Sequence, residues 1–208
     1  MAKVLQGDFT RKKKNIAKKG TEKKLVPGYQ LKISITFSDP LIWRRILVPG
    51  SMTLASLHRA IQVCMGWCDS DTHQFLVGKI FYQTGFGIEN MKKNPEYDEA
   101  NYKLYQLEES MQFIFTYLYD GGEGWELELT LEDVLPQGCK EKHPVLLDGM
   151  LGCPPQEVGD IHQYQALLDE FERSGDESQK YLAIPDGPDF YPELFDIDLI
   201  NDRLRDIT

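Results

Sequence analysis

The sequence predicts an α+β fold: an antiparallel or mixed sheet built from hairpins, with one intervening helix and C-terminal helices packed on it. Apolar and polar residues alternate over 29–37, which is typical of a strand with one buried face. Apolar residues recur at helical spacing over 54–65, and amphipathic helical patterns return only after residue 160. Strands therefore come first and most helices come last, which is the order of an α+β domain.

Each predicted element has a local reason. Ser38-Asp39-Pro40 turns the first strand into a second at 42–48, so the two form a hairpin. Thr53 is a suitable N-cap for the helix that follows, and Gly66 is a suitable end. Further strands are expected at 74–82, 113–118 and 125–131, with the last two joined by 120–124, and further helices at 162–173 and 196–207.

Charge divides the chain into two parts. Residues 1–24 contain nine lysines or arginines and two acids, whereas the whole chain has a net charge of −10. A segment so basic and so poor in apolar residues cannot bury enough surface to offset the entropy of ordering. We therefore expect a disordered basic tail over 1–26 and a single α+β domain over 27–208, with a long surface loop at 83–103.

Composition also restricts the cellular context. No apolar run is long enough to cross a bilayer, and the first residues lack the apolar centre of a secretory signal. The four cysteines are then expected to be reduced thiols of a cytoplasmic protein. An acidic body repels phosphate, so contact with nucleic acid is expected only through the basic tail. No contact with a membrane is expected.

Two segments combine glycine, proline, aromatic and acidic residues in a way that core packing does not require. They are FIFTYLYDGGEGW at 113–125 and LDGMLGCPPQEVGD at 147–160. We expect the 119–125 turn and the 149–160 elbow to line one cleft that binds a protein or peptide, because aromatic residues beside rigid prolines give contact area at low entropic cost. The expected binding residues are Tyr119, Asp120, Gly121, Gly122, Trp125, Cys153, Pro154, Pro155 and Asp160.

A second interpretation is a metal-assisted or acid–base enzyme that uses the same cleft. One histidine and three carboxylates could bind a cation or exchange protons; the candidates are His73, Asp120, Glu123 and Glu157. Equally, Asp120 serves to stabilise its glycine-rich turn, as aspartate commonly does.

A zinc site is a weaker alternative, because the C-x3-C spacing is looser than that of usual zinc knuckles; its candidates are Cys64, Cys68, Cys139 and His143. No motif names a cofactor, and the sequence leaves both an enzyme and a binding module open.

Several of these segments are also landmarks of a known family. They are YQLKISITFSDPLIWRRILVPGSMTLASLHRAIQVCMGW at 29–67, HQF at 73–75, 115–125, 149–160 and FDIDLIN at 195–201. On these landmarks the chain resembles the plasmid pRiA ORF-three-like family, some members of which carry a transposon-resolvase label. The resemblance implies a third possibility, an accessory protein in mobile-element DNA transactions.

The chain departs from the family pattern at two acidic positions. Family members show Tyr-Asp-Phe-Gly-Asp before the tryptophan, whereas this chain has YDGGEG at 119–124. They show Ala-Cys-Pro-Pro-Glu-Asp at the elbow, whereas this chain has GCPPQE at 152–157. These changes weigh against a strict acid–base role for the altered positions. The body also lacks the serine among arginines that a serine resolvase requires.

Overall fold

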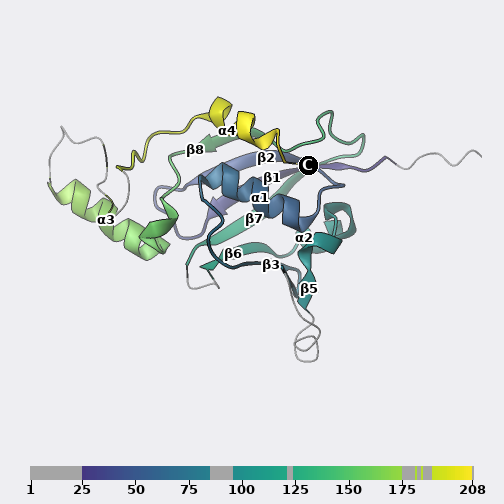
Figure 1. Ribbon diagram of the computed structural model, residues 1–208, viewed down its shortest axis with the longest axis horizontal. Coiled ribbons are helices and arrows are strands. Elements are labelled where there is room, and N and C mark those ends of the chain that lie inside the picture. The colour runs from purple at the N-terminus through teal and green to yellow at the C-terminus, as the bar shows by residue number, and fades with distance from the viewer. Residues whose placement is uncertain are drawn as a thin grey trace, which may run out of the picture.

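The computed structural model describes residues 25–84, 96–120, 124–174, 181, 184 and 189–207. An eight-stranded sheet with the order β5-β4-β3-β6-β7-β1-β2-β8 forms its centre, and α1 crosses one face of it (Figure 1). The strands are β1 (Gly28–Ile35), β2 (Trp43–Pro49), β3 (His73–Val77), β4 (Ile80–Gln83), β5 (Glu96–Asp98), β6 (Phe115–Tyr119), β7 (Glu126–Leu135) and β8 (Val145–Met150). The helices are α1 (Leu54–Met65), α2 (Glu108–Met111), α3 (Ile161–Ser174) and α4 (Ile197–Leu204). The predicted α+β class is confirmed.

The middle of the sheet follows the alternation seen in the sequence. β1 lies between β7 and β2, antiparallel to both. Its residues Tyr29, Leu31, Ile33 and Ile35 are all buried on one face. The predicted hairpin joins β1 to β2, with Ser34 opposite Trp43. Burial of these large apolar side chains supplies the main stabilisation of the sheet.

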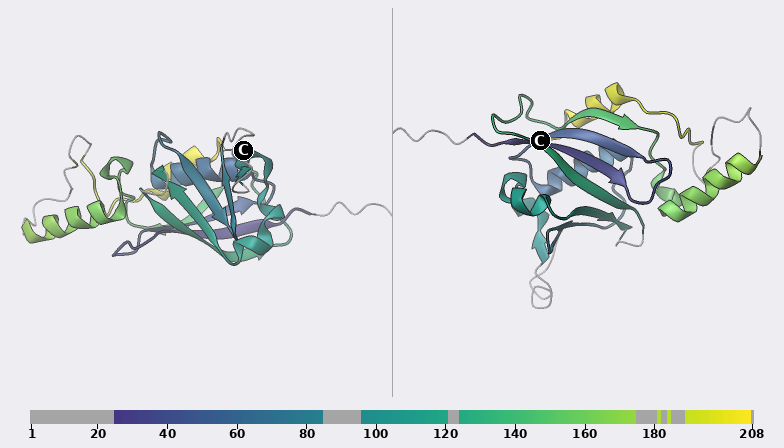
Figure 2. Two further views of the ribbon diagram at one scale, coloured as in Figure 1. Left: turned by 90° about the horizontal axis from the view of Figure 1, so that it is seen from below. Right: turned by 180° about the vertical axis from the view of Figure 1, so that it is seen from behind.

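Helix α1 is defined by its two caps. At its start, Oγ1 of Thr53 accepts a hydrogen bond from the Ser56 N–H at 3.1 Å. At its end, Gly66 has φ 75°, a left-handed conformation that suits glycine, and its N–H bonds back to the helix. Between the caps, Leu57 and Ile61 are buried against the sheet. The helix lies along one face of the sheet (Figure 2).

Three expectations about the middle of the chain need correction. The single strand expected at 74–82 is a hairpin of β3 and β4, because Gly78 adopts φ 63° and reverses the chain. Phe113, expected to begin the strand at 113–118, precedes β6 and is 83% exposed. The loop expected at 83–103 contains β5, which pairs in parallel with β4. Residues 85–95 of that loop lie outside the described residues.

The C-terminal part covers the edge of the sheet beyond β2. There β8, a strand that the sequence did not predict, pairs with β2. Asn201 of α4 bonds to both backbone groups of Leu146 in β8, accepting from its N–H at 2.8 Å and donating to its carbonyl at 2.9 Å. These bonds occupy backbone groups at the outer edge of β8 that could otherwise pair with a strand of another chain. Helix α3, by contrast, extends away from the sheet (Figure 2).

Two sequence expectations concern parts of the chain beyond this core. Residues 1–24 of the expected basic tail lie outside the described residues. Within the described ranges, no helix has the length and apolar character needed to cross a membrane.

Candidate functional site

A pocket of about 850 Å³ opens between α1, the segment that follows it, β3 and the 99–101 turn. His58 and Arg59 reach the pocket from α1, His73 from the first position of β3, and Glu99 from the turn. Asp69 lines the same space from the connection between α1 and β3. We call this space the histidine pocket. Its volume is in the range typical of small-molecule sites.

The two histidine rings form a stack. Their centroids are 3.5 Å apart and the ring planes differ by 1°. Both rings are almost fully enclosed by protein. Burial lowers the pKa of His58 below that of an ordinary histidine, and the charge that His73 can carry lowers it further. His58 is therefore a neutral imidazole near pH 7.

A closed ring of hydrogen bonds sets the tautomer of His58. Its Nε2 lies 2.8 Å from Oδ1 of Asp69, and its Nδ1 lies 2.9 Å from the Tyr117 hydroxyl. Gln62 donates to the same hydroxyl and accepts from the Asp69 N–H. Since an ionised carboxylate only accepts, we assign the proton of His58 to Nε2. Burial raises the pKa of Tyr117, so its hydroxyl keeps the proton that it donates to Nδ1.

His73 is oriented by a buried carboxylate of its own. Its Nε2 lies 3.0 Å and 2.9 Å from the two carboxylate oxygens of Glu99, which is 2% exposed. Thr84 donates a further hydrogen bond to Glu99 at 2.7 Å. Burial by itself would raise the pKa of Glu99, but the hydrogen bonds from His73 and Thr84 hold it below the usual value. Glu99 is thus ionised and accepts the hydrogen bond from Nε2 of His73. When the His73 ring is neutral, its lone pair therefore lies on Nδ1.

Asp69 completes the group at the open side of the pocket. Its backbone has φ 55°, in the left-handed region that aspartate tolerates better than most residues. Its side chain is 53% exposed, yet one carboxylate oxygen reaches His58. One ring nitrogen each of His58 and His73 and one oxygen of Asp69 all lie within 4.8 Å of one another. Two imidazoles and one carboxylate are a common ligand set for transition-metal ions that keep open positions.

The turn and elbow expected to form a binding cleft are packed against each other. Tyr119 donates to Oε1 of Gln156 at 3.3 Å, and Nε1 of Trp125 lies 3.5 Å from the Gln156 carbonyl. Trp67 stacks on Tyr119 and donates to the Pro154 carbonyl at 2.9 Å. Trp125, expected to be one of the binding residues of the cleft, is only 1% exposed, because its ring packs against Trp67 and the backbone of Gln156.

The other candidates of these two segments have separate surroundings. Asp120 is exposed and its N–H bonds to the Thr72 carbonyl at 2.8 Å, so it shapes the backbone beside the histidine pocket. Glu157 is exposed on the elbow, and Asp160 accepts from the N–H of Gln163 at the start of α3. Pro155 is half-buried, and Gly121, Gly122 and Glu123 lie outside the described residues. The carboxylate that pairs with His73 is Glu99, from the segment expected to be a long surface loop.

The four candidate zinc ligands do not meet. Cys64 is buried, Cys68 is exposed, Cys139 donates to the Val48 carbonyl at 3.3 Å, and His143 pairs with Glu141. Burial raises the pKa of the Cys64 thiol to about 12, so it remains protonated. Cys64 lies in α1 and Cys68 just after it, whereas Cys139 and His143 lie in the connection between β7 and β8.

Sequence reasoning named His73 but missed His58, Asp69 and Glu99. One signal was present for His58. His58 and Gln62 are one helical turn apart and interrupt the apolar face of α1, and buried polar residues in such a face require partners.

Comparison with known proteins places the chain in a family. Residues 27–199 match the family described as plasmid pRiA4b ORF-3-like protein. The chain belongs to this family. It is 32% identical over 142 residues to the uncharacterized protein y4hQ of Sinorhizobium fredii. The aligned region covers 67% of this chain and 71% of that protein. A crystal structure of MM3350, a protein of unknown function from Methanosarcina mazei Go1, is similar with a TM-score of 0.67 and 28% identity, covering 84% of this chain and 97% of that one. The resemblance inferred from the sequence is confirmed.

Proposed function

We propose that the protein is a metal-assisted enzyme whose divalent transition-metal ion is held by His58, Asp69 and His73. The observation that carries the proposal is the grouping of their donor atoms within 4.8 Å of one another at a pocket of about 850 Å³. Three protein ligands leave open positions for water and substrate, as in catalytic zinc and non-haem iron centres. The remaining pocket volume is the space in which a small substrate would lie.

The groups behind the ligands support this assignment. Metal-binding histidines usually donate their second nitrogen to a carboxylate or another acceptor, which fixes the ring and increases its basicity. Glu99 has this position behind His73. Tyr117 has it behind His58, whose Nδ1 it contacts at 2.9 Å. An ion on Nε2 of His58 would require the neutral ring to carry its proton on Nδ1, and the Tyr117 hydroxyl would then turn to accept that N–H instead of donating to it.

The stacked rings add a physical requirement. The lone pair of an imidazole lies in the ring plane, so two parallel rings do not point at a common ion. At least one ring must tilt out of the stack when His58 and His73 share a metal. Asp69 is well placed to follow this change, because its side chain contacts His58 and is 53% exposed at the mouth of the pocket.

Titration of the metal-free protein with Co²⁺ tests the proposal. We expect one ion per chain, with visible absorption bands from nitrogen and oxygen ligands. Asp69→Asn should weaken binding strongly, and it is the preferred variant because Asp69 is half exposed and its loss spares the core. His73→Gln should do the same. His143→Gln is the matched control, since His143 lies near Glu141 rather than in the pocket. Stoichiometric binding that survives Asp69→Asn and His73→Gln would overturn the assignment.

A second candidate is acid–base catalysis by the Glu99–His73 pair without a metal. It is favoured by the two short contacts between Nε2 and the carboxylate, which leave Nδ1 as the basic nitrogen. The titration separates the two candidates: a chain that binds no Co²⁺, Zn²⁺ or Mn²⁺ at neutral pH would favour the pair acting alone.

A further inference from the structure

Two neighbouring arginines of β2 face opposite sides of the sheet. Arg45 lies on the outer face, where it pairs with Glu132 at 2.5 Å and with Asp148 at 3.3 Å. Arg44 points inward and is 2% exposed. A buried charge without a counter-charge is costly.

Within the described part of the chain, the guanidinium of Arg44 bonds only to backbone carbonyls. Its Nε donates to Cys64 at 3.1 Å, and Nη1 donates to Trp43 at 2.8 Å and to Met150 at 3.0 Å. Its Cζ lies 4.2 Å from the centre of the Phe195 ring. A guanidinium has five N–H donors. Among the described residues, Nη2 has no acceptor and no carboxylate lies within ion-pair distance of Arg44.

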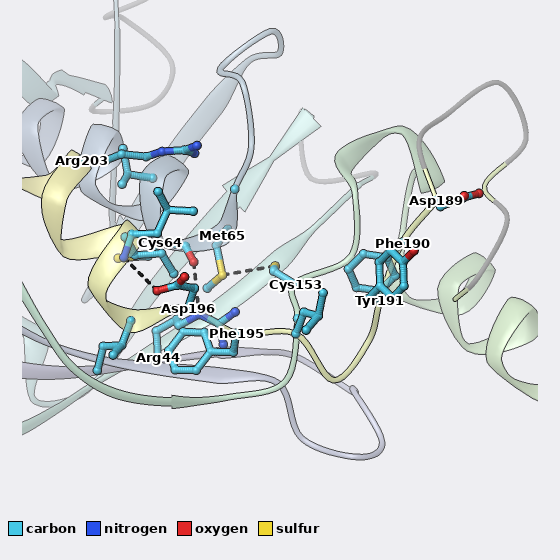
Figure 3. A pocket seen from close by; sticks show the side chains of 17 residues that line it. Arg44, Cys64, Met65, Cys153, Asp189, Phe190, Tyr191, Phe195, Asp196 and Arg203 are labelled. Carbon is cyan, nitrogen blue, oxygen red and sulfur yellow. Dashed lines mark hydrogen bonds between the residues drawn. The ribbon is translucent and has the colours of Figure 1, made fainter. Parts of the chain in front are cut away.

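The neighbouring thiols do not supply the missing negative charge. Cys64 and Cys153 lie close to Arg44, and Cys153 is 3.4 Å from the sulfur of Met65 (Figure 3). Burial raises the pKa of Cys64 and of Cys153 to about 12 in each case, even though the positive charge of Arg44 acts in the other direction. Both thiols are neutral at physiological pH, and the charge of Arg44 remains uncompensated.

Arg44 lines a second pocket, which we call the arginine pocket. It has a volume of about 770 Å³ and lies between the C-terminal half of α1, the segment before α4, and α4 itself (Figure 3). Most of its wall is apolar, and Leu194 and Leu199 are large apolar side chains left exposed there. The charged groups other than Arg44 are on exposed residues: Asp189, Asp196 and Arg203.

Two glycines allow the segment before α4 to close this pocket. A Cβ at Gly149 would lie 2.6 Å from Cζ of Phe195 and 3.0 Å from Cδ of Arg44. A Cβ at Gly152 would lie 2.8 Å from the Tyr191 carbonyl oxygen. Side chains at these positions would push the segment away from β8. The glycines of the elbow thus serve the close approach that brings Phe195 onto Arg44.

We propose that the arginine pocket binds an amphipathic monocarboxylate, with the carboxylate on Nη2 of Arg44 and the hydrocarbon part along Phe195, Leu199 and Ile200. One buried positive charge matches one negative charge. The second charge of a phosphate dianion would have only the exposed Arg203 to meet it, on a wall that also carries the exposed Asp189 and Asp196. An apolar wall with a single polar group that fixes orientation is the usual form of a small-molecule site. The proposal is independent of the histidine pocket, with which the arginine pocket shares no residue.

Isothermal titration with octanoate, octanol and octyl phosphate tests the proposal on the full chain. We expect one octanoate per chain, bound more than about tenfold more tightly than octanol, because the charged hydrogen bond is lost in the alcohol. Arg44→Met should remove this preference, since methionine keeps much of the volume but has no charge. Arg45→Met is the matched control and should leave the octanoate affinity unchanged.

Three results would overturn the proposal: equal affinities for octanoate and octanol, tighter binding of octyl phosphate than of octanoate, or an octanoate preference that survives Arg44→Met. Leu199→Asp covers the case in which Arg44→Met does not fold, because Leu199 is half exposed and its replacement spares the core. The added negative charge should weaken octanoate binding more than octanol binding. An equal effect on both ligands would also contradict the proposal.

Discussion

The imidazole rings of His58 and His73 lie parallel at 3.5 Å although one belongs to a helix and the other to a strand. Each ring has a carboxylate of its own, Asp69 for His58 and Glu99 for His73. This arrangement keeps two titratable rings in contact inside the protein, where two positive charges at that distance would repel strongly. It also leaves Asp69 and one nitrogen of each ring close enough to share an ion.

Glu99→Gln should weaken metal binding without removing a ligand. Loss of the carboxylate behind a metal-binding histidine typically reduces affinity about 10- to 100-fold, because the ring loses its orientation and basicity. Competition with a chromophoric chelator measures this change. Glu128→Gln, at an exposed position of β7, should leave the affinity as it is. If Glu99→Gln also leaves the metal affinity unchanged, then Glu99 does not orient a metal ligand.

Tyr117→Phe should destabilise the fold by about 1–3 kcal/mol. The hydroxyl contacts Nδ1 of His58 and Nε2 of Gln62, and both groups are buried. Its removal leaves a buried donor and a buried acceptor without partners. Urea unfolding gives the free-energy difference, with Tyr105→Phe as the exposed control. A change no larger than that of the control would show that water or a rotated side chain replaces the hydroxyl.

Trp125→Ala should cost about 3–5 kcal/mol, the range for loss of a large buried ring. The ring is enclosed by Trp67 and by the backbone of Gln156. Trp43→Ala should cost clearly less, because Trp43 is only half-buried, on the outer face of β2. Both values come from chemical unfolding. Similar losses for the two variants would contradict the role of Trp125 as a packing residue between turn and elbow.

The pair of Arg45 and Glu132 should make stability depend on pH. The hydrogen bond from Arg45 lowers the pKa of Glu132 in the folded protein. A carboxylate with a lowered pKa stabilises the fold above its unfolded pKa, which is about 4.3 for glutamate. This stabilisation is lost as the pH falls through the folded pKa. Glu132→Gln should therefore melt below the wild type at neutral pH, and the two melting temperatures should converge in acid.

Glu126→Gln provides the control for this series, because Glu126 is an exposed residue of the same strand. Thermal melts followed by circular dichroism over the acidic range supply the measurement. A constant difference between the wild type and Glu132→Gln at every pH would show that Glu132 acts by packing and not by its charge.

The sequence by itself determined the elements whose stability is local. The alternation in β1 and the caps Thr53 and Gly66 of α1 are properties of neighbouring residues, and the structure has them where they were expected. Gly78 shows the limit of such patterns. Residues 74–82 are apolar enough for one strand, but a single backbone reversal at Gly78, with φ 63°, makes them two. β8 was missed because its pairing with β2 depends on a partner about 100 residues away in the sequence, as the Arg45–Asp148 contact illustrates.

Only the tertiary structure decided which polar side chains meet. His58, His73 and Glu99 come from α1, β3 and a turn within the segment expected to be a surface loop, and no spacing in the chain relates them. The same is true of Arg44 and Phe195, which are brought together by β8 and α4. Local patterns report which face of an element is buried, because burial repeats with the period of that element. They do not report which buried face lies opposite another, because that depends on sheet order and packing.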